Sequence, residues 1–145
     1  MTPFWLISLG SPNQTALDFL GNSTRIILAI ERSRSVGSKF LCLPELCLTG
    51  YGCEDQFLSQ AYLRQAEREV VKLLDYTQDF TLLVGAPIAV NHQVYNGMIM
   101  IQDQQILGIV PKKKLAAGGI YYESRHFTPW PVNSHTHIHY AGCDH

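Results

Sequence analysis

Three short and nearly continuous apolar runs constrain the fold of this chain more than any other feature of its sequence. They are FWLISL at 4–9, FLCLPEL at 40–46 and TLLVGAP at 81–87. Runs of this length without polar alternation are typical of strands that are covered on both faces of a sheet. We therefore predict three buried strands at these positions.

Two helical patterns separate the three runs. The first starts after Asn22 or Ser23, either of which can cap a helix, and Gly37 is its predicted terminator. The second is QAYLRQAEREVVKLLD at 60–75. Its apolar residues recur at helical spacing and predict an amphipathic helix. They are Leu63, Ala66, Val70, Leu73 and Leu74.

Residues 95–102 and 105–111 alternate around the turn-prone Asp103, which predicts a hairpin. Helices that alternate with apolar strands, followed by this hairpin, predict an α/β domain with a mixed sheet. The 145 residues suffice for one domain with a real core. We assign it to 1–131 and leave the tail at 132–145 unassigned.

Composition and charge exclude several classes of partner. The net charge is −1 and the longest basic run is Lys112–Lys114, so we expect no nucleic-acid binding. No segment approaches the ~18 apolar residues that a membrane helix needs. The start resembles no secretory signal, and four cysteines without CxxC spacing indicate reduced thiols. These features favour a cytoplasmic protein.

Two charged residues follow buried strands and are candidates for chemistry. Glu45 lies at the predicted carboxyl end of strand 40–46, where open α/β sheets bind ligands, and could act as a general base. A glutamate at a strand end more commonly faces solvent or pairs with a lysine, and the position alone favours that interpretation. Lys112 leaves strand 105–111 and could stabilise an oxyanion, or belong to a solvated basic patch together with Lys113 and Lys114.

Three blocks of sequence resemble one enzyme family. They are LPELCLTGYGCED at 43–55, the GN-x-x-RI start of the first helix, and PKKKLAAGGIYYESRHFTPW at 111–130. Together they resemble the carbon–nitrogen hydrolase (nitrilase) superfamily and, more narrowly, the N-terminal glutaminase domain of glutamine-dependent NAD synthetases. The resemblance implies the N-terminal half of an α-β-β-α sandwich, with a mixed sheet and two helices on one side.

The resemblance also implies the roles of four residues in a Glu–Lys–Cys mechanism. Glu45 matches the general base and Lys112 the catalytic lysine. Tyr51 matches a tyrosine that lines the glutamine pocket, and Glu123 matches an acidic residue near the site. In this chemistry a cysteine thiolate attacks the glutamine amide, forms a thioester and releases ammonia, and water then releases glutamate. The glutaminase half needs no cofactor.

The expected nucleophile is missing from the sequence. In the family it follows a further buried strand that ends in I-C-E-D-x-W, which this chain lacks. Cys143 is the only cysteine beyond Lys112 and has no apolar lead-in, so we regard it as a weak candidate. Cys53 precedes Glu54 and Asp55, but the family carries those letters in its first block too. Cys42 and Cys47 flank Glu45 and are expected to be core thiols.

We therefore expect a truncated and inactive hydrolase domain. The synthetase domain that would use ATP and Mg²⁺ is absent, since no Gly-rich phosphate loop appears in the sequence. The expected partners are glutamine, that synthetase domain and further copies of the chain in a homo-oligomer. A half-domain should expose apolar surface and a sheet edge, so we also expect self-association.

Three alternatives remain open at this stage. A related amidase would share the residues but act on another amide, and a degenerate homologue would bind without catalysis. A metal-binding module is also conceivable, because His135, His137 and His139 alternate and would share one face of a strand. Cys143 and His145 follow closely. A solvated tail accounts for the same residues, and we assign no metal ligand.

Overall fold

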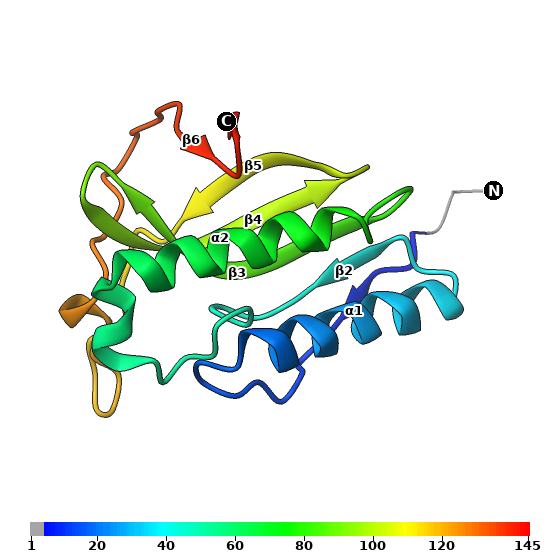
Figure 1. Cartoon of the computed structure of the whole chain (residues 1–145), viewed down its shortest axis with the longest axis horizontal. Coiled ribbons are helices and arrows are strands. Elements are labelled where there is room, and N and C mark those ends of the chain that lie inside the picture. Colours follow the sequence, from blue (N-terminus) through cyan, green and yellow to red (C-terminus); the bar gives the residue numbers. More distant parts are fainter. Residues whose placement is uncertain (1–4) are drawn as a thin grey trace.

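A five-stranded mixed sheet forms the centre of the molecule, as a computed structural model shows for residues 5–145 (Figure 1). The strands stand in the order β1-β2-β3-β4-β5. β1 and β3 pair with β2 in parallel, and β4 is antiparallel to both β3 and β5. In chain order the elements are β1 (Ser8–Leu9), α1 (Phe19–Ser35), β2 (Phe40–Cys42), η1 (Glu54–Leu58), α2 (Gln60–Leu74), β3 (Thr81–Val90), β4 (Gln93–Gln102), β5 (Gln105–Pro111), η2 (Glu123–Arg125), β6 (His139–Tyr140) and β7 (Cys143–Asp144).

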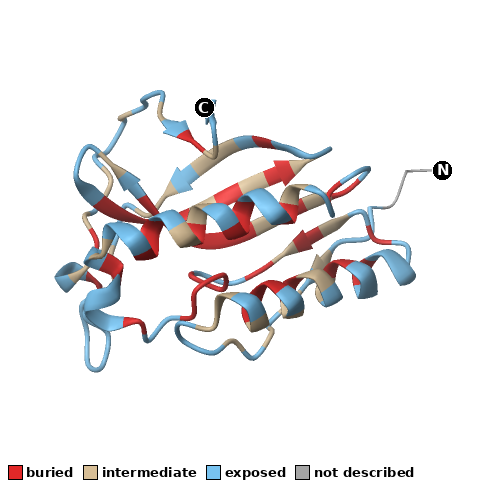
Figure 2. Cartoon of the chain, viewed as in Figure 1, coloured by how far each residue is buried: buried red, intermediate tan, exposed pale blue. Residues whose placement is uncertain are grey.

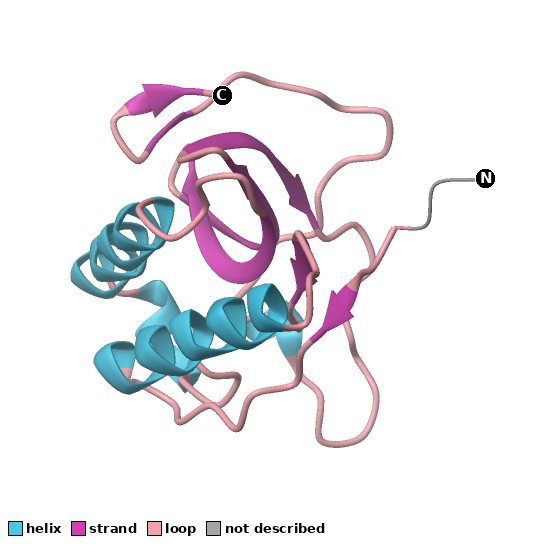
Figure 3. Cartoon of the chain, turned by 90° about the vertical axis from the view of Figure 1, so that its right-hand side faces the viewer, coloured by secondary structure: helices cyan, strands magenta, loops and turns pink. Residues whose placement is uncertain are grey.

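Both long helices lie on the same side of the sheet (Figure 3). α2 begins after Ser59, whose hydroxyl accepts a hydrogen bond from the Tyr62 N–H, and its apolar stripe is buried as predicted. Leu74 is the one member of that stripe that is only partly buried. The main core lies between the helices and the sheet (Figure 2) and includes Ile26 and Ile30 of α1 and Ala66, Val70 and Leu73 of α2.

The predicted start of α1 is wrong by one turn. The helix begins at Phe19, and its N-cap is Asp18 rather than Asn22 or Ser23. Asp18 Oδ1 accepts a hydrogen bond from the Gly21 N–H at 2.9 Å, which closes the first turn. Asn22 is instead buried inside the helix. Its amide donates to the carbonyls of Thr15 and Leu48, so a residue that resembles a cap anchors the preceding loop.

The predicted strand at 40–46 is also too long, because β2 ends at Cys42 and residues 45–49 form a tight turn. Pro44 has no N–H to donate, and Leu46 has a φ of 49°, which a strand does not allow. The first apolar run likewise gives only a two-residue strand, β1. Phe4 lies outside the described residues.

Two tight turns fold β3, β4 and β5 into a meander. The predicted turn at Asp103 is confirmed, and Asp103 and Gln104 both have positive φ. A second turn of the same kind, at Asn91 and His92, joins β3 to β4 and was not predicted. β3 and β4 are therefore both longer than predicted: β3 continues to Val90, and β4 begins at Gln93.

The tail after Trp130 packs onto this body. β6 and β7 form a small antiparallel hairpin (Figure 1). Tyr140 is 4% exposed and joins the main core, and the Ala141 N–H donates to Glu67 of α2 at 2.6 Å. Across the described residues, none of the helices combines the length and the apolar character that crossing a membrane requires.

Candidate active site

Glu45 reaches the sheet through the turn that follows β2. This turn lies directly against β3 at Gly85, where an added Cβ would stand 2.5 Å from the Leu46 nitrogen and 2.5 Å from the Pro44 oxygen. Only glycine permits so close an approach between the two backbones. The Glu45 carboxylate points outward from the turn, and its side chain is 45% exposed.

Lys112 lies one residue beyond β5. Its N–H donates to the Asn96 carbonyl at 2.8 Å, and its carbonyl accepts from the Trp130 N–H at 3.0 Å. These two bonds extend the sheet pairing past Pro111 and hold the lysine backbone. The Lys112 Nζ lies 2.8 Å from Glu45 Oε1, although the two residues are 67 positions apart in the sequence.

Glu123 is the most deeply buried of these charged groups, with its side chain 1% exposed. Its carboxylate accepts hydrogen bonds from four donors. The Ala116 N–H donates at 2.6 Å, Lys112 Nζ lies 3.0 Å away, and Asn96 Nδ2 donates at 3.1 Å. The Tyr51 hydroxyl is the fourth donor. Such a donor set suits an ionised carboxylate in a site with little water.

Their surroundings favour the charged forms of Lys112 and Glu123 near neutral pH. Burial opposes the charge of Lys112, but the hydrogen bonds and charges of Glu45 and Glu123 outweigh it and raise the lysine pKa. Burial also opposes the charge of Glu123. The bonds from Tyr51, Ala116 and Lys112 outweigh it and lower the pKa of that carboxyl. Burial, followed by the bond to Glu123, raises the pKa of Tyr51.

The structure thus brings together all four residues singled out in the sequence: Glu45, Tyr51, Lys112 and Glu123. Sequence analysis missed Asn96, which donates to both carboxylates from the middle of β4. The signal was present, since one amide interrupts the apolar strand VYNGMIMI. We call these five residues the carboxylate–lysine cluster.

Two cavities flank the cluster. One has a volume of about 170 Å³ and is lined by Glu45, Asn96 and Lys112 together with Met98. The other, of about 280 Å³, is lined by Tyr51, Glu123 and several aromatic side chains. The cluster can therefore meet a small polar molecule from either side, with a cation and a solvent-accessible carboxylate in the first cavity.

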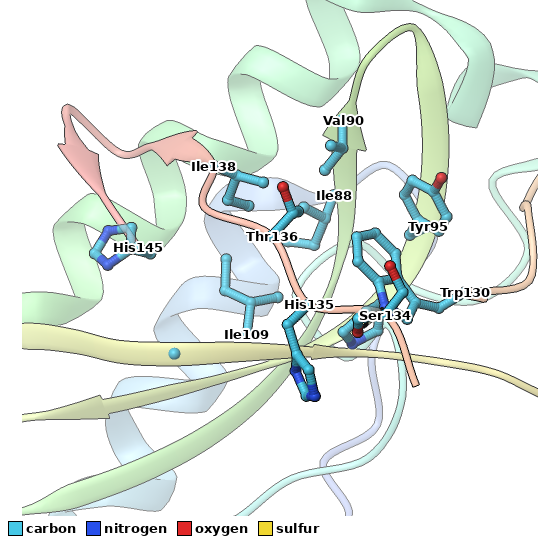
Figure 4. A pocket seen from close by; sticks show the side chains of 12 residues that line it. Ile88, Val90, Tyr95, Ile109, Trp130, Ser134, His135, Thr136, Ile138 and His145 are labelled. Carbon is cyan, nitrogen blue, oxygen red and sulfur yellow. Dashed lines mark hydrogen bonds between the residues drawn. The ribbon is translucent and has the colours of Figure 1, made fainter. Parts of the chain in front are cut away.

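A third cavity, of about 220 Å³, lies under the tail (Figure 4). Its walls include Ile88, Tyr95 and Trp130 from the body and Ile138 and His145 from the tail. Neither Glu45, Lys112 nor Glu123 reaches it. Because its lining is mainly apolar and contains no carboxylate, we place the candidate site at the carboxylate–lysine cluster.

The four cysteines lie apart from this cluster. Cys53 is 2% exposed and its Sγ donates to the Thr49 and Gly50 carbonyls, at 3.1 and 3.3 Å. Cys47 is buried, which raises the pKa of its thiol to about 12. Cys143 is exposed on β7. Within 5–145, no hydrogen bond links a thiol to the cluster, and no cysteine lines either flanking cavity.

The histidine-rich tail does not form the expected strand face. Of the three alternating histidines only His139 lies in a strand, where its Nδ1 is 3.0 Å from Asp144 Oδ1. His135 and His137 are exposed in irregular chain. Over the described part of the chain, His, Cys, Asp and Glu side chains nowhere gather in a group of three that could hold a metal ion.

Known proteins of similar sequence match most of the chain. The carbon-nitrogen hydrolase family model matches residues 6–142. A glutamine-dependent NAD(+) synthetase of Dictyostelium discoideum is 40% identical over 121 residues, which make up 81% of this chain and 17% of the relative. The synthetase of Homo sapiens is 38% identical over 126 residues, or 86% of this chain and 18% of the relative. The chain therefore spans less than a fifth of the length of these curated relatives.

Solved structures show the same fold. The crystal structure of a glutamine-dependent NAD(+) synthetase from Cytophaga hutchinsonii has a TM-score of 0.86 and 36% identity, and the match covers 91% of this chain and 23% of that one. An amidase from Nesterenkonia sp. has a TM-score of 0.73 at 19% identity, over 95% of this chain and 52% of that one. The mixed sheet and two helices confirm the predicted nitrilase-like fold. Because the family model spans nearly all of the sequence, the chain belongs to the carbon-nitrogen hydrolase family.

Proposed function

We propose that this chain forms part of a glutaminase that hydrolyses the side-chain amide of glutamine. In the longer protein, the released ammonia would serve an ATP- and Mg²⁺-dependent synthesis of NAD from nicotinate adenine dinucleotide. One observation carries the proposal. The Lys112 cation, just past the end of β5, lies between the exposed carboxylate of Glu45 and the buried carboxylate of Glu123. Similarity to glutamine-dependent NAD(+) synthetases supports glutamine as the substrate.

In the proposed reaction Glu45 is the general base. It takes the proton of a cysteine thiol as sulfur attacks the amide carbon, and returns it to the nitrogen as the C–N bond breaks. Lys112 keeps its charge and stabilises the tetrahedral oxyanion. Glu123 holds the lysine in place. Tyr51 and Glu123 together form the glutamine side of the pocket. Water then cleaves the thioester, and glutamate leaves.

We further propose that the thiol comes from outside the present sequence. The four cysteines of this chain make their contacts elsewhere, and Cys143 lies on the tail hairpin. The proposed partners are accordingly the remaining part of the hydrolase domain, a C-terminal synthetase domain and further copies of the protein. Free thiols at all four cysteines are consistent with a cytoplasmic setting.

Release of glutamate and ammonia from glutamine tests this proposal. The 145-residue chain should be inactive, whereas a product of the same reading frame that continues past His145 should be active. In the active form, Glu45→Gln and Lys112→Met should each lower kcat at least a hundredfold. Lys113→Met is the matched control and should leave the rate within about twofold.

Two results would contradict the proposal in different ways. Activity of the 145-residue chain that disappears in Cys143→Ala would show that the nucleophile lies on the tail. A longer form that hydrolyses other primary amides but not glutamine would keep the mechanism and exclude the substrate. That second result would favour an amidase.

A further inference from the structure

Asn96 occupies an unusual position for a polar side chain. It lies in β4 between the apolar residues of a central strand, opposite Pro87 of β3, and is 3% exposed. A buried amide is costly unless its hydrogen-bonding groups find partners. The partners of Asn96 come from three other segments of the chain, so its place in the strand serves contacts beyond the sheet itself.

The side-chain nitrogen of Asn96 faces two carboxylates. It donates to Glu123 Oε1 at 3.1 Å and approaches Glu45 Oε2 at 3.4 Å. An asparagine amide has two N–H groups, one for each acceptor. Ionised carboxylates offer no proton, so the nitrogen and not the oxygen of the amide must face them. The orientation of this side chain therefore follows from the charges around it.

The backbone of the same residue holds the lysine. The Asn96 carbonyl accepts the hydrogen bond from the Lys112 N–H at 2.8 Å. One residue thus binds the backbone of the cation and both of its counter-ions. The cluster carries two negative charges and one positive charge, and like charges this close disfavour their own ionisation. A neutral donor between the carboxylates lowers that repulsion. Because it carries no charge, it leaves the attraction between Lys112 and the carboxylates in place.

We propose that Asn96 is a positioning residue that keeps Glu45 and Glu123 on either side of Lys112 through its two side-chain N–H groups. In this scheme it acts through the two carboxylates. Its effect on turnover rests on the proposed glutaminase function. Its effect on the carboxylates does not, because the contacts exist within the 145-residue chain.

Carbon-13 NMR titration of the glutamate carboxyl groups in the 145-residue chain tests the proposal without any need for catalysis. In Asn96→Leu, which keeps the approximate shape but removes both donors, the titration midpoint of Glu123 should rise by about one pH unit. That is about a tenfold gain in proton affinity. Asn22→Leu removes another buried amide, on α1, and should leave the Glu123 midpoint unchanged. A folded Asn96→Leu with an unchanged midpoint would refute the proposal.

A second measurement uses the unaltered chain, so it does not depend on whether the variant folds. The two side-chain amide protons of Asn96 should shift with the midpoint of Glu123 as pH falls. Amide-proton chemical shifts that do not change over the titration of Glu123 would also overturn the inference. Both NMR results could hold while every form of the protein that continues past His145 fails to hydrolyse glutamine. In that case the proposed function fails and the positioning role of Asn96 stands.

Discussion

Replacement of Glu123 by glutamine should destabilise the fold strongly, even though the two side chains have nearly the same shape. The carboxylate is 1% exposed and accepts four hydrogen bonds, from Tyr51, Asn96, Lys112 and Ala116. Glutamine can offer one oxygen to these donors, and its NH₂ group would face other donors. The ammonium of Lys112 would also lose its buried counter-ion.

The magnitude follows from these contacts. A hydrogen bond to a charged group contributes about 1.5–3 kcal/mol, and breaking one partner of a buried ion pair costs about 3–5 kcal/mol. With about half of the acceptor capacity lost, Glu123→Gln should lower the free energy of unfolding by about 3–5 kcal/mol at pH 7. Urea denaturation of the 145-residue chain measures it. Glu31→Gln, at an exposed position on α1, should change it by less than about 0.5 kcal/mol.

The pH dependence separates a charge effect from a loss of shape. The pKa of Glu123 is lower in the folded than in the unfolded chain. The contribution of this carboxylate to the free energy of unfolding is therefore complete above the unfolded pKa of about 4.3, and it disappears as pH falls through the lower folded value. The difference in unfolding free energy between the wild type and Glu123→Gln should therefore shrink below about pH 4. A difference under about 1 kcal/mol at pH 7, or one that does not change with pH, would refute the reasoning.

Three further predictions concern the surface and the thiols. Arg125→Ala breaks an exposed bidentate pair with Asp55 and should leave the urea midpoint nearly unchanged; a fall as large as that of Glu123→Gln would show a larger role. Iodoacetamide should modify the exposed Cys143 at least tenfold faster than the buried Cys47 in the native chain, as mass spectrometry can follow, and equal rates would contradict the burial. Leu9 is 82% exposed on an edge strand, so Leu9→Lys should reduce self-association in sedimentation; association that persists unchanged would place the contact elsewhere.

Local periodicity was sufficient to predict most of the fold. The apolar stripe of α2 and the turn at Asp103 could be read directly, because each depends on neighbours within a few residues. The start of α1 and the end of β2 could not. Asn22 resembles a cap but bonds to a carbonyl 26 residues away, and the apolar letters around Leu46 conceal a positive φ.

The site shows the same division. Glu45 and Lys112 were recognisable from family motifs, as were Tyr51 and Glu123. Asn96 belongs to none of the motifs, and its contacts join residues 27 and 51 positions away. Such contacts exist only once β3, β4 and β5 have paired. Cys53 differs, because its contacts are local: two carboxylates follow it in the sequence, but its thiol donates to the Thr49 carbonyl four residues earlier.

Gly85 gives this site a sensitivity that a list of its polar groups would not reveal. The turn that carries Glu45 rests on the bare Cα of β3, and the nearest atoms lie 2.5 Å from where a Cβ would be. Even the smallest side chain there must push the turn away from the sheet, and with it the carboxylate. A substitution that adds one methyl group and touches no charge would thus separate Glu45 from Lys112, so that a defect of the site would map to a residue with no functional group.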